Sequence, residues 1–297
     1  MEYDYNMLKE AGKVSSQALQ RARETIRPGM KLLDIAEDLE AFIKGKGCEL
    51  SFPVNLSINE SAAHYTPEYG DASILPDESV LKVDLGARKG VYLTDCAITL
   101  SFSDKYSDLV RASEEALESA ISLVRAGRPV NEIGREIGSV AKKHGVNPIR
   151  NLGGHGIEQD ELHASVFIPN YDNGDATPLE EGQVIAIEPF MTTGEGHVVS
   201  GEHLQIFQKV SEGQLRSQEA RDASAFIDKN YLTFPFATRW LVNGLGLGEF
   251  KARKAIAEMM NAGMLEPFPV LVERSRGMVS QHEKSLIVEK DSCAIVT

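Results

Sequence analysis

The chain has 297 residues and carries 31 Lys and Arg against 44 Asp and Glu, which gives a formal net charge of −13. Hydrophobic residues make up 42% of it and charged residues 25%, a composition typical of a globular protein with a sizeable core, and this excludes a disordered chain. The acidic balance argues against a nucleic-acid binder and against docking on anionic lipid, because both depend on positive charge.

The N-terminus and the cysteines bear on location. The first residues, MEYDY, lack the basic and then apolar layout of a signal peptide. No run of about 18 uncharged apolar residues is present, so a membrane span is not expected. Cys48, Cys96 and Cys293 have no paired spacing, which favours reduced thiols over a disulfide framework. We therefore expect a cytoplasmic protein.

Two stretches of the chain match at a constant offset of 98 residues. Residues 27–36 (RPGMKLLDIA) lie over residues 125–134 (RAGRPVNEIG), and each reads as a break containing glycine between two helices. Apolar residues recur at helical spacing over 32–43. Asp34 and Glu132 fall in the expected first turns, where a carboxylate meets the positive end of the helix dipole. We interpret the match as an internal duplication; chance similarity between amphipathic helices is the alternative.

Strand-like sequence follows each helix pair. In the first half, Ser79–Leu85 and Val91–Phe102 flank a short turn, which predicts a hairpin. In the second half, Gln183–Ile187 and His197–Phe207 are expected to play the same part, and Val279–Val288 reads as a further strand. Helices that cover strands in two similar halves predict an α+β sandwich with an internal pseudo-two-fold axis. A site between the halves would draw groups from both.

The segment from about residue 217 to 273 has a different texture. Thr238–Leu245 and Glu249–Asn261 read as short helices joined by a Gly-Leu-Gly turn, and a strand follows. This order is the outline of a winged helix. Basic and acidic residues nearly balance in it, so nucleic-acid binding is not predicted. We interpret it as an insert that packs on the main domain.

Asp84 and Asp95 lie on the two arms of the predicted hairpin, in apolar strand sequence. If Lys89 and Gly90 are the turn residues, the two aspartates face each other directly, with Cβ atoms about 4.5–5.5 Å apart. Two ionised carboxylates at that distance repel each other unless a cation holds them. The alternative is a register shifted by one residue, which points them to opposite faces.

Further candidate groups lie elsewhere in the chain. His155 is set among glycines (GGHG), which allow close approach of another group, and His163 follows it. Glu188 ends an apolar run, where burial would require a partner; a solvent-exposed strand end is the alternative. Glu283 lies near the start of the last strand, which also suits a surface position, and His64 lies in a polar loop.

Four carboxylates and one imidazole among these groups come from both halves of the chain: Asp84, Asp95, His155, Glu188 and Glu283. An ordinary core does not tolerate four converging carboxylates, whereas two divalent cations neutralise them. Oxygen-rich ligands with one imidazole suit Mn, Fe, Co or Zn rather than a thiolate-type site. The sequence therefore predicts two divalent metal ions per chain.

The motifs resemble those of the type 2 methionine aminopeptidases, in the short form without a basic N-terminal extension. The resemblance covers nearly the whole chain and depends on the order and spacing of all the motifs. They are Phe52–Asn59, Ala62–Pro67, Lys82–Gly86, Thr94–Ala97, Gly153–Ile157 with His163, Ile187–Phe190 and Gln281–Glu283. The resemblance implies the pita-bread (creatinase/aminopeptidase) fold. It divides the chain into a catalytic domain of residues 1–204 and 274–297 and an inserted winged-helix-like helical subdomain of residues 205–273.

The resemblance also implies a metal-binding role for each member of the cluster. Asp84 is expected to bind one metal ion with both oxygens, and Asp95 and Glu283 to bridge the two ions. His155 and Glu188 are expected to complete the shell of the other ion.

Catalytic and substrate-binding roles follow from the same resemblance. Glu188 is expected to shuttle a proton from water to the leaving amine. His163 is expected to contact the substrate near the scissile carbonyl and His64 near the scissile nitrogen, while Phe52 lines the methionine pocket.

The implied activity is that of a methionyl aminopeptidase. Such an enzyme removes the initiator methionine from nascent proteins and peptides with a small second residue, near the ribosome, and the family suggests a monomer. One alternative is a prolidase or proline-specific aminopeptidase of the same fold, although Asp84 comes too early for the N-terminal domain those enzymes usually carry. The other is a non-enzymatic interaction protein on this fold, which the complete ligand set disfavours.

Overall fold

Two helix pairs frame the molecule in the computed structural model, which describes residues 3–297. The pairs are α1 (Tyr5–Thr25) with α2 (Leu32–Gly45), and α3 (Ser107–Leu123) with α4 (Val130–Lys143). The glycines before α2 and α4, Gly29 and Gly127, both take left-handed φ values, 84° and 77°, as the tight break requires. Asp34 and Glu132 lie in the predicted first turns. The 98-residue repeat is therefore a structural one, because α2 and α4 start at positions 32 and 130.

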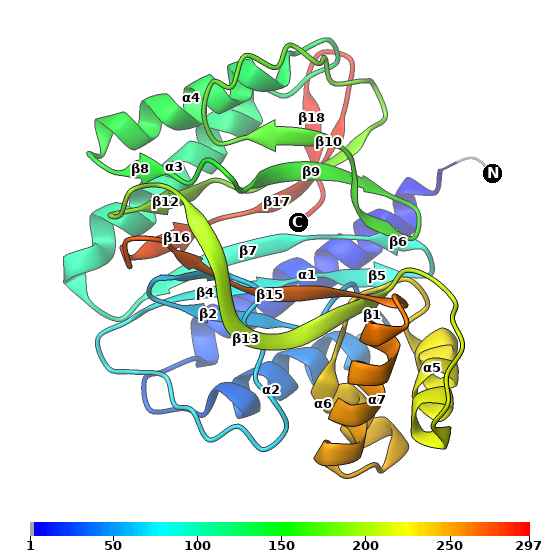
Figure 1. Cartoon of the computed structure of the whole chain (residues 1–297). Coiled ribbons are helices and arrows are strands. Elements are labelled where there is room, and N and C mark those ends of the chain that lie inside the picture. The colour runs from blue at the N-terminus through cyan, green and yellow to red at the C-terminus, as the bar shows by residue number, and fades with distance from the viewer. Residues whose placement is uncertain (1–2) are drawn as a thin grey trace.

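Each helix pair covers its own apolar cluster. Ile35 and Leu39 of α2 belong to the first cluster, and Ile133 and Ile137 of α4 belong to the second. In Figure 1, α2 lies below the strands and α1 passes behind them, both in blue, while α4 lies above the strands in green. This arrangement confirms the α+β prediction. Within residues 3–297, no helix is both long and apolar enough to cross a membrane.

The strands between the helix pairs form several antiparallel sheets. In the first half, β2 (Asn55–Ile58), β4 (Val80–Leu85) and β7 (Cys96–Ser101) lie in that order, beside β1 (Glu49–Leu50), β5 (Ala87–Lys89) and β6 (Tyr92–Leu93). In the second half, the order is β10 (Glu161–Pro169), β9 (Gly153–Glu158), β11 (Val184–Ile187), β17 (Lys284–Val288) and β18 (Cys293–Ile295). Another sheet has β16 (Val279–Gln281), β12 (Phe190–Thr192) and β8 (Asn147–Pro148), and a short 3-10 helix spans Asp104–Tyr106.

The insert leaves and rejoins the sheet through two long strands. These are β13 (Val198–Lys209) and β15 (Leu265–Glu273), which pair with each other and with β14 (Phe236–Ala237) and β3 (Ser61–Ala63). Helices α5 (Gln218–Asn230), α6 (Thr238–Leu245) and α7 (Glu249–Asn261) pack on one another at the lower right of Figure 1. The two helices predicted from the sequence are thus confirmed with the same bounds. Trp240 and Leu241 of α6 belong to the same apolar cluster as α2, so the insert shares a core with the first half.

The predicted hairpin register is wrong by two residues. Asp84 pairs with Ala97 rather than Asp95, and Lys89 pairs with Tyr92. The cause is Gly90, which takes the left-handed φ of 61° at the first turn position instead of the second. A shift of two keeps side chains on their original face, so both aspartates still point the same way.

The predicted hairpin of the second half is also wrong. The 183–187 stretch, seen as β11, pairs with β9 and β17, and the 197–207 stretch, seen as β13, pairs with β14 and β15. The second-half hairpin is β9–β10. The reason is that β13 leads into the insert and the chain returns beside it as β15.

Candidate metal centre

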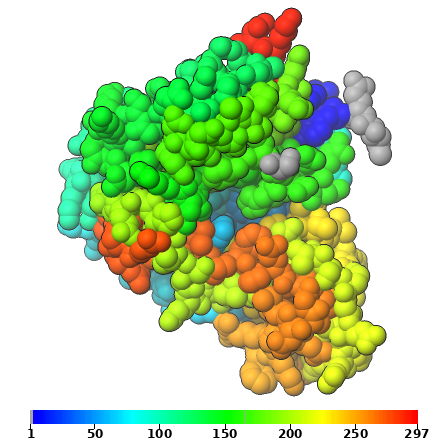
Figure 2. Space-filling view, turned by 45° about the horizontal axis from the view of Figure 1, so that its top comes forward, coloured from blue at the N-terminus to red at the C-terminus, as the bar shows by residue number. Residues whose placement is uncertain are grey.

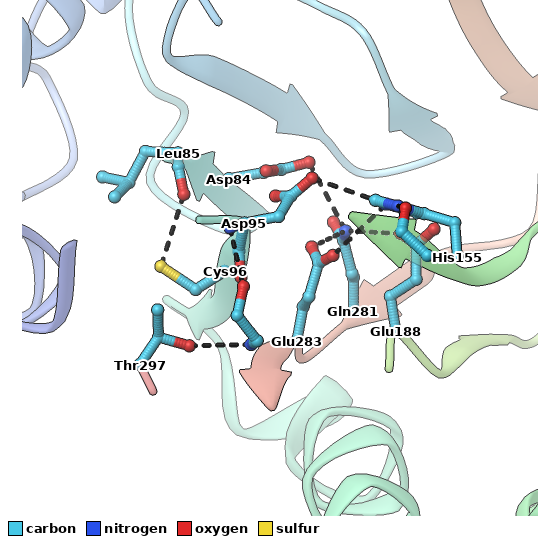
Figure 3. Close-up of polar contacts among 11 residues, drawn as sticks. Asp84, Leu85, Asp95, Cys96, His155, Glu188, Gln281, Glu283 and Thr297 are labelled. Carbon is cyan, nitrogen blue, oxygen red and sulfur yellow. Dashed lines mark hydrogen bonds and ion pairs between the residues drawn. The ribbon is translucent and has the colours of Figure 1, made fainter. Parts of the chain in front are cut away.

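Five sequence-predicted groups converge between the two halves. Asp84 lies on β4, Asp95 just before β7, His155 on β9, Glu188 just after β11, and Glu283 between β16 and β17. Their side chains point toward a common space (Figure 3). One ligand atom from each of Asp95, His155 and Glu283 lies within 4.8 Å of the other two. These three side chains are buried, so the cluster is withdrawn from bulk water.

His155 is oriented so that its Nε2 faces the carboxylate oxygens of Asp95 and Glu283. Its Nδ1 lies 3.1 Å from the carbonyl oxygen of Gly156 and must donate, because a carbonyl only accepts. Burial lowers the pKa of His155 to about 4, so the ring is neutral and Nε2 carries a lone pair. That Nε2 faces Asp95 Oδ2 at 3.5 Å and Glu283 Oε1 at 4.0 Å. A lone pair directed at carboxylates favours a cation between them.

Gln281 is a member of the site that sequence reasoning did not single out. Its Nε2 lies 3.4 Å from Asp84 Oδ2, 3.3 Å from Glu188 Oε2 and 3.3 Å from Glu283 Oε2. The Gln281 amide thus lies among the carboxylates as a neutral donor, as Figure 3 shows. Its signal in the sequence is the two-residue spacing from Glu283, because residues i and i+2 of an extended segment share a face.

The protein supplies too few hydrogen-bond donors for the buried carboxylates of this cluster. Asp84 Oδ1, Asp95 Oδ1 and Glu283 Oε1 are buried and have no hydrogen-bond partner within the described chain. Burial, followed by mutual repulsion, raises the pKa values of Asp84, Glu188 and Glu283 well above normal. Burial also raises the pKa of Asp95 to about 7, against hydrogen bonds from Asp84 and Glu283 that lower it. Buried oxygens in this state call for protons or for cations.

The glycines around His155 let neighbouring strands, rather than a ligand, approach closely. A Cβ on Gly154 would lie 2.2 Å from the carbonyl oxygen of Ala186 on β11, and one on Gly153 would lie 2.4 Å from that of Ile168 on β10. Side chains there would push the strands apart. The close packing of β9 brings His155 within reach of Asp95 and Glu283.

A cavity of about 350 Å³ opens above the cluster. Its walls are mostly apolar and include Phe52, Leu152, Leu162, Phe190, Ile206 and Phe268. Figure 2 shows a cleft between the green second half and the yellow and orange insert, with first-half residues in blue and cyan at its floor. The pocket therefore draws its walls from both halves and from the insert, as the pseudo-two-fold prediction requires.

His64 and His163 line this cavity beside the cluster. The ring of Phe268 lies between them, with ring centres 5.6 Å from His64 and 6.4 Å from His163. His163 also meets the ring of His155 at 4.5 Å. Desolvation lowers the pKa of His64 to about 4 and that of His163 to about 3, although the His163 side chain is exposed along the cavity. Both rings are therefore neutral near pH 7. The one N–H of His64 lies on Nδ1, which donates to the Pro269 carbonyl oxygen at 3.3 Å, so its Nε2 is an acceptor.

Residues 6–209 match metallopeptidase family M24. The chain belongs to this family. Among the curated relatives of this chain, the methionine aminopeptidase of Pyrococcus horikoshii is 43% identical over 295 residues, which cover 99% of each of the two chains.

Solved structures share the fold. A thermophilic Arx1 matches with a TM-score of 0.86 at 19% identity, over 98% of this chain and 89% of that one. The methionine aminopeptidase of Rickettsia prowazekii matches with a TM-score of 0.71 at 19% identity, over 100% and 98%. At these identities the likeness establishes the pita-bread fold alone.

Family membership implies the use of divalent metal, and the cluster fits it. The unpartnered oxygens of Asp84, Asp95 and Glu283 and the lone pair of His155 are the donors that such an ion requires. Carboxylate oxygens with one imidazole nitrogen suit first-row divalent ions such as Mn, Fe, Co or Zn. They do not suit ions that prefer thiolate ligands.

Proposed function

We propose that this M24 chain hydrolyses the first peptide bond of proteins and peptides that begin with methionine, preferring a small second residue. The observation that carries the proposal is the acidic cluster at the floor of an apolar cavity flanked by two neutral histidines. The full-length similarity to a methionine aminopeptidase at 43% identity supports it. An unbranched apolar side chain such as that of methionine suits walls formed by Phe52, Phe190 and Phe268.

The five converging groups are proposed to hold two divalent ions, Co, Mn, Fe or Zn. Asp84 would help to hold one ion, His155 and Glu188 would help to hold the other, and Asp95 and Glu283 would contribute to both. Charge balance supports the number, because two divalent ions neutralise four carboxylates. Bound ions of this kind supply a Lewis acid for the scissile carbonyl and a nucleophile at neutral pH.

The chain's own groups are proposed to move and hold the protons. Glu188 accepts a proton from the attacking water on a carboxylate oxygen and passes it to the leaving nitrogen. Burial and the neighbouring Asp95 and Asp84 raise the pKa of Glu188, which favours uptake of a proton by this carboxylate. His163 donates its N–H to the developing oxyanion, and His64 Nε2 accepts the N–H of the scissile bond, because its Nδ1 donates to the Pro269 carbonyl oxygen at 3.3 Å.

We place this activity in the cytoplasm, on nascent chains near the ribosome, and carried out by a monomer. The N-terminal peptide of a newly made chain is the substrate that the proposed reaction requires, and an exopeptidase must meet it once its end is free. The acidic net charge of −13 supports a peptide substrate over nucleic acid.

Metal removal is the direct test of the proposed function. Protein stripped of metal is expected to lose hydrolysis of Met-Ala-Ser and to regain it with Mn or Co, while Ala-Pro peptides stay uncleaved throughout. Mass spectrometry of the native holoprotein is expected to count two ions per chain. Full activity in excess chelator contradicts the proposal, and selective cleavage of Ala-Pro peptides assigns a proline-specific enzyme instead.

A His64→Ala variant separates substrate contact from metal binding. We expect turnover of Met-Ala-Ser to fall by about 10²-fold, as when a positioned hydrogen-bonding group is lost, with two ions still bound. Turnover and metal content are measured on the same preparation. A large loss of metal instead would assign His64 to the metal shell.

A further inference from the structure

A buried ion pair joins the insert to the first half of the chain. Arg239 of α6 is 1% exposed, and its Nη2 donates to Oε1 of Glu40 on α2. The neighbouring Trp240 donates its Nε1 to Glu40 Oε2 at 2.9 Å. Two consecutive residues of α6 therefore bind one carboxylate, and each uses a different oxygen of Glu40.

The other arm of Arg239 extends to a segment of the cavity wall. Its Nη1 donates to Thr66 Oγ1 at 2.7 Å and to the carbonyl oxygen of Pro67 at 3.1 Å. The Thr66 hydroxyl in turn donates to the carbonyl of Val54 at 2.9 Å, and the Val54 N–H donates to Glu40 Oε1 at 3.3 Å. The network thus closes on two segments, residues 52–55 and 63–66, and Phe52, Asn55 and His64 of these segments line the cavity.

His64 has a backbone conformation that its surroundings must impose. Its φ of 64° lies in the left-handed region, which residues with a side chain seldom occupy unless tertiary contacts hold them there. On the N-terminal side, Ala63 pairs with Leu271 of β15. On the C-terminal side, the Tyr65 carbonyl accepts from the Leu56 N–H at 2.7 Å, and Thr66 is fully buried.

The residue after Tyr65 is held twice by the insert and its connecting strands. His203 of β13 lies with Nε2 3.2 Å from the Thr66 carbonyl oxygen, to which it donates, and its ring stacks on Tyr65 at 4.8 Å. Arg239 holds the Thr66 hydroxyl. To anchor α6, the Arg239 guanidinium would need only its ion pair with Glu40. Its Nη1 also donates to Thr66 and Pro67, in the segment that carries His64.

We propose that Arg239 is a positioning residue for the aminopeptidase reaction, acting through Thr66 to keep the His64 ring directed into the cavity. The insert thereby takes part in catalysis through a buried link rather than through contact with substrate. This inference rests on the proposed function, because it requires that His64 contacts the scissile nitrogen.

A double-mutant cycle on the metal-loaded, full-length chain tests the inference. Arg239→Lys keeps the charge opposite Glu40 but loses the forked second arm, and Thr66→Val removes the hydroxyl at nearly constant volume. Each is expected to lower kcat for Met-Ala-Ser by about 10-fold with KM nearly unchanged, because displaced catalytic groups cost rate. In a His64→Ala background, each is expected to cause a further loss of less than about twofold, because coupled changes are not additive.

Trp240→Phe is the matched control. It removes a buried hydrogen bond to Glu40 from the same helix, and within the described residues Trp240 makes no hydrogen bond to Thr66, so it is expected to lower the melting temperature and leave kcat within about twofold. Losses that multiply in the His64→Ala background, or an equal kcat loss in Trp240→Phe, overturn the inference. If Arg239→Lys does not fold, Thr66→Val decides alone. If His64→Ala itself keeps full turnover, the role of His64 in the proposed function fails, and the role of Arg239 fails with it.

Discussion

Replacing Glu188 with glutamine is expected to lower kcat for Met-Ala-Ser by about 10²–10⁴-fold at saturating metal, the range for loss of a positioned acid or base. Glutamine keeps the shape and one carbonyl oxygen but cannot accept the proton of the attacking water. The carboxylate lies just after β11, where Gln281 Nε2 reaches its Oε2 at 3.3 Å. The substitution changes this polar group and leaves the apolar side chains of the cavity wall in place. The measurement is the steady-state rate across a metal titration.

The control separates proton transfer from metal binding. Metal content by mass spectrometry must match that of the wild type at the concentration used for the assay. Glu181→Gln changes an exposed carboxylate three residues before β11 and is expected to leave both rate and metal content unchanged. Near-normal turnover in Glu188→Gln removes Glu188 from the proton-shuttle role.

The membership of the cluster was predictable because its chemistry is unusual within each local segment. Asp84 and Glu188 each interrupt or end an apolar strand, and an acidic group there needs a partner. Convergence, however, was inferred from charge balance and family resemblance rather than from geometry. The roles of these residues stay predictions until the variants above are measured.

The register of the hairpin shows what a local pattern leaves open. The choice between a turn at Lys89-Gly90 and one at Gly90-Val91 depends on which turn position takes the left-handed φ, and glycine fits several of them. Both registers put Asp84 and Asp95 on one face, since they differ by two residues. The prediction of proximity thus survived an error in the pairing that was used to derive it.

Long-range pairing was the part that sequence could not supply. Helices α6 and α7 were predicted with their observed bounds because the glycine turn between them is a local signal, whereas α5 was not predicted. The partners of β13 were not, since β15 follows it only after the whole insert. Gln281 was overlooked for a similar reason: an amide carries no charge that must be explained, and two of its three carboxylate neighbours, Asp84 and Glu188, lie far from it in the sequence.

The metal-free protein is expected to become less stable as pH rises above about 6.5. The carboxyl groups of Asp84, Asp95, Glu188 and Glu283 have raised pKa values in the folded state, mainly through burial. A group of this kind binds protons more tightly when folded, so its contribution to stability is complete below the unfolded pKa and is lost as pH rises through the folded pKa. For Asp95 the loss extends from the ordinary pKa of 3.8 to the folded pKa of about 7 and is complete above it, so the further loss at higher pH comes from the other three groups.

Buried histidines act in the opposite direction at lower pH. The pKa values are lowered by burial to about 4 for His64 and His155 and to about 3 for His163 and His282. The unfolded chain then binds more protons than the folded one until pH passes the ordinary value of 6.5, so these groups add stability as pH rises to that point. The two effects offset each other below pH 6.5, and the carboxylates alone remain above it. For each proton that the folded state binds in excess of the unfolded state, the free energy of unfolding falls by about 1.4 kcal/mol for every unit by which the pH rises.

Divalent metal is expected to remove this pH dependence, because the ions replace the protons that the carboxylates would otherwise need. The melting temperature of the metal-loaded protein is therefore expected to stay level between pH 6.5 and 8.5, while that of the metal-free protein falls. Glu283→Gln is the matched variant, because it removes one buried charge and leaves the shape of the side chain. Metal-free Glu283→Gln is expected to melt above metal-free wild type at pH 8.5 and to gain much less from added Mn. Equal melting curves for the two metal-free proteins at that pH would mean that Glu283 carries no unfavourable charge in the fold, and with it the electrostatic case for a cation at this site would be lost.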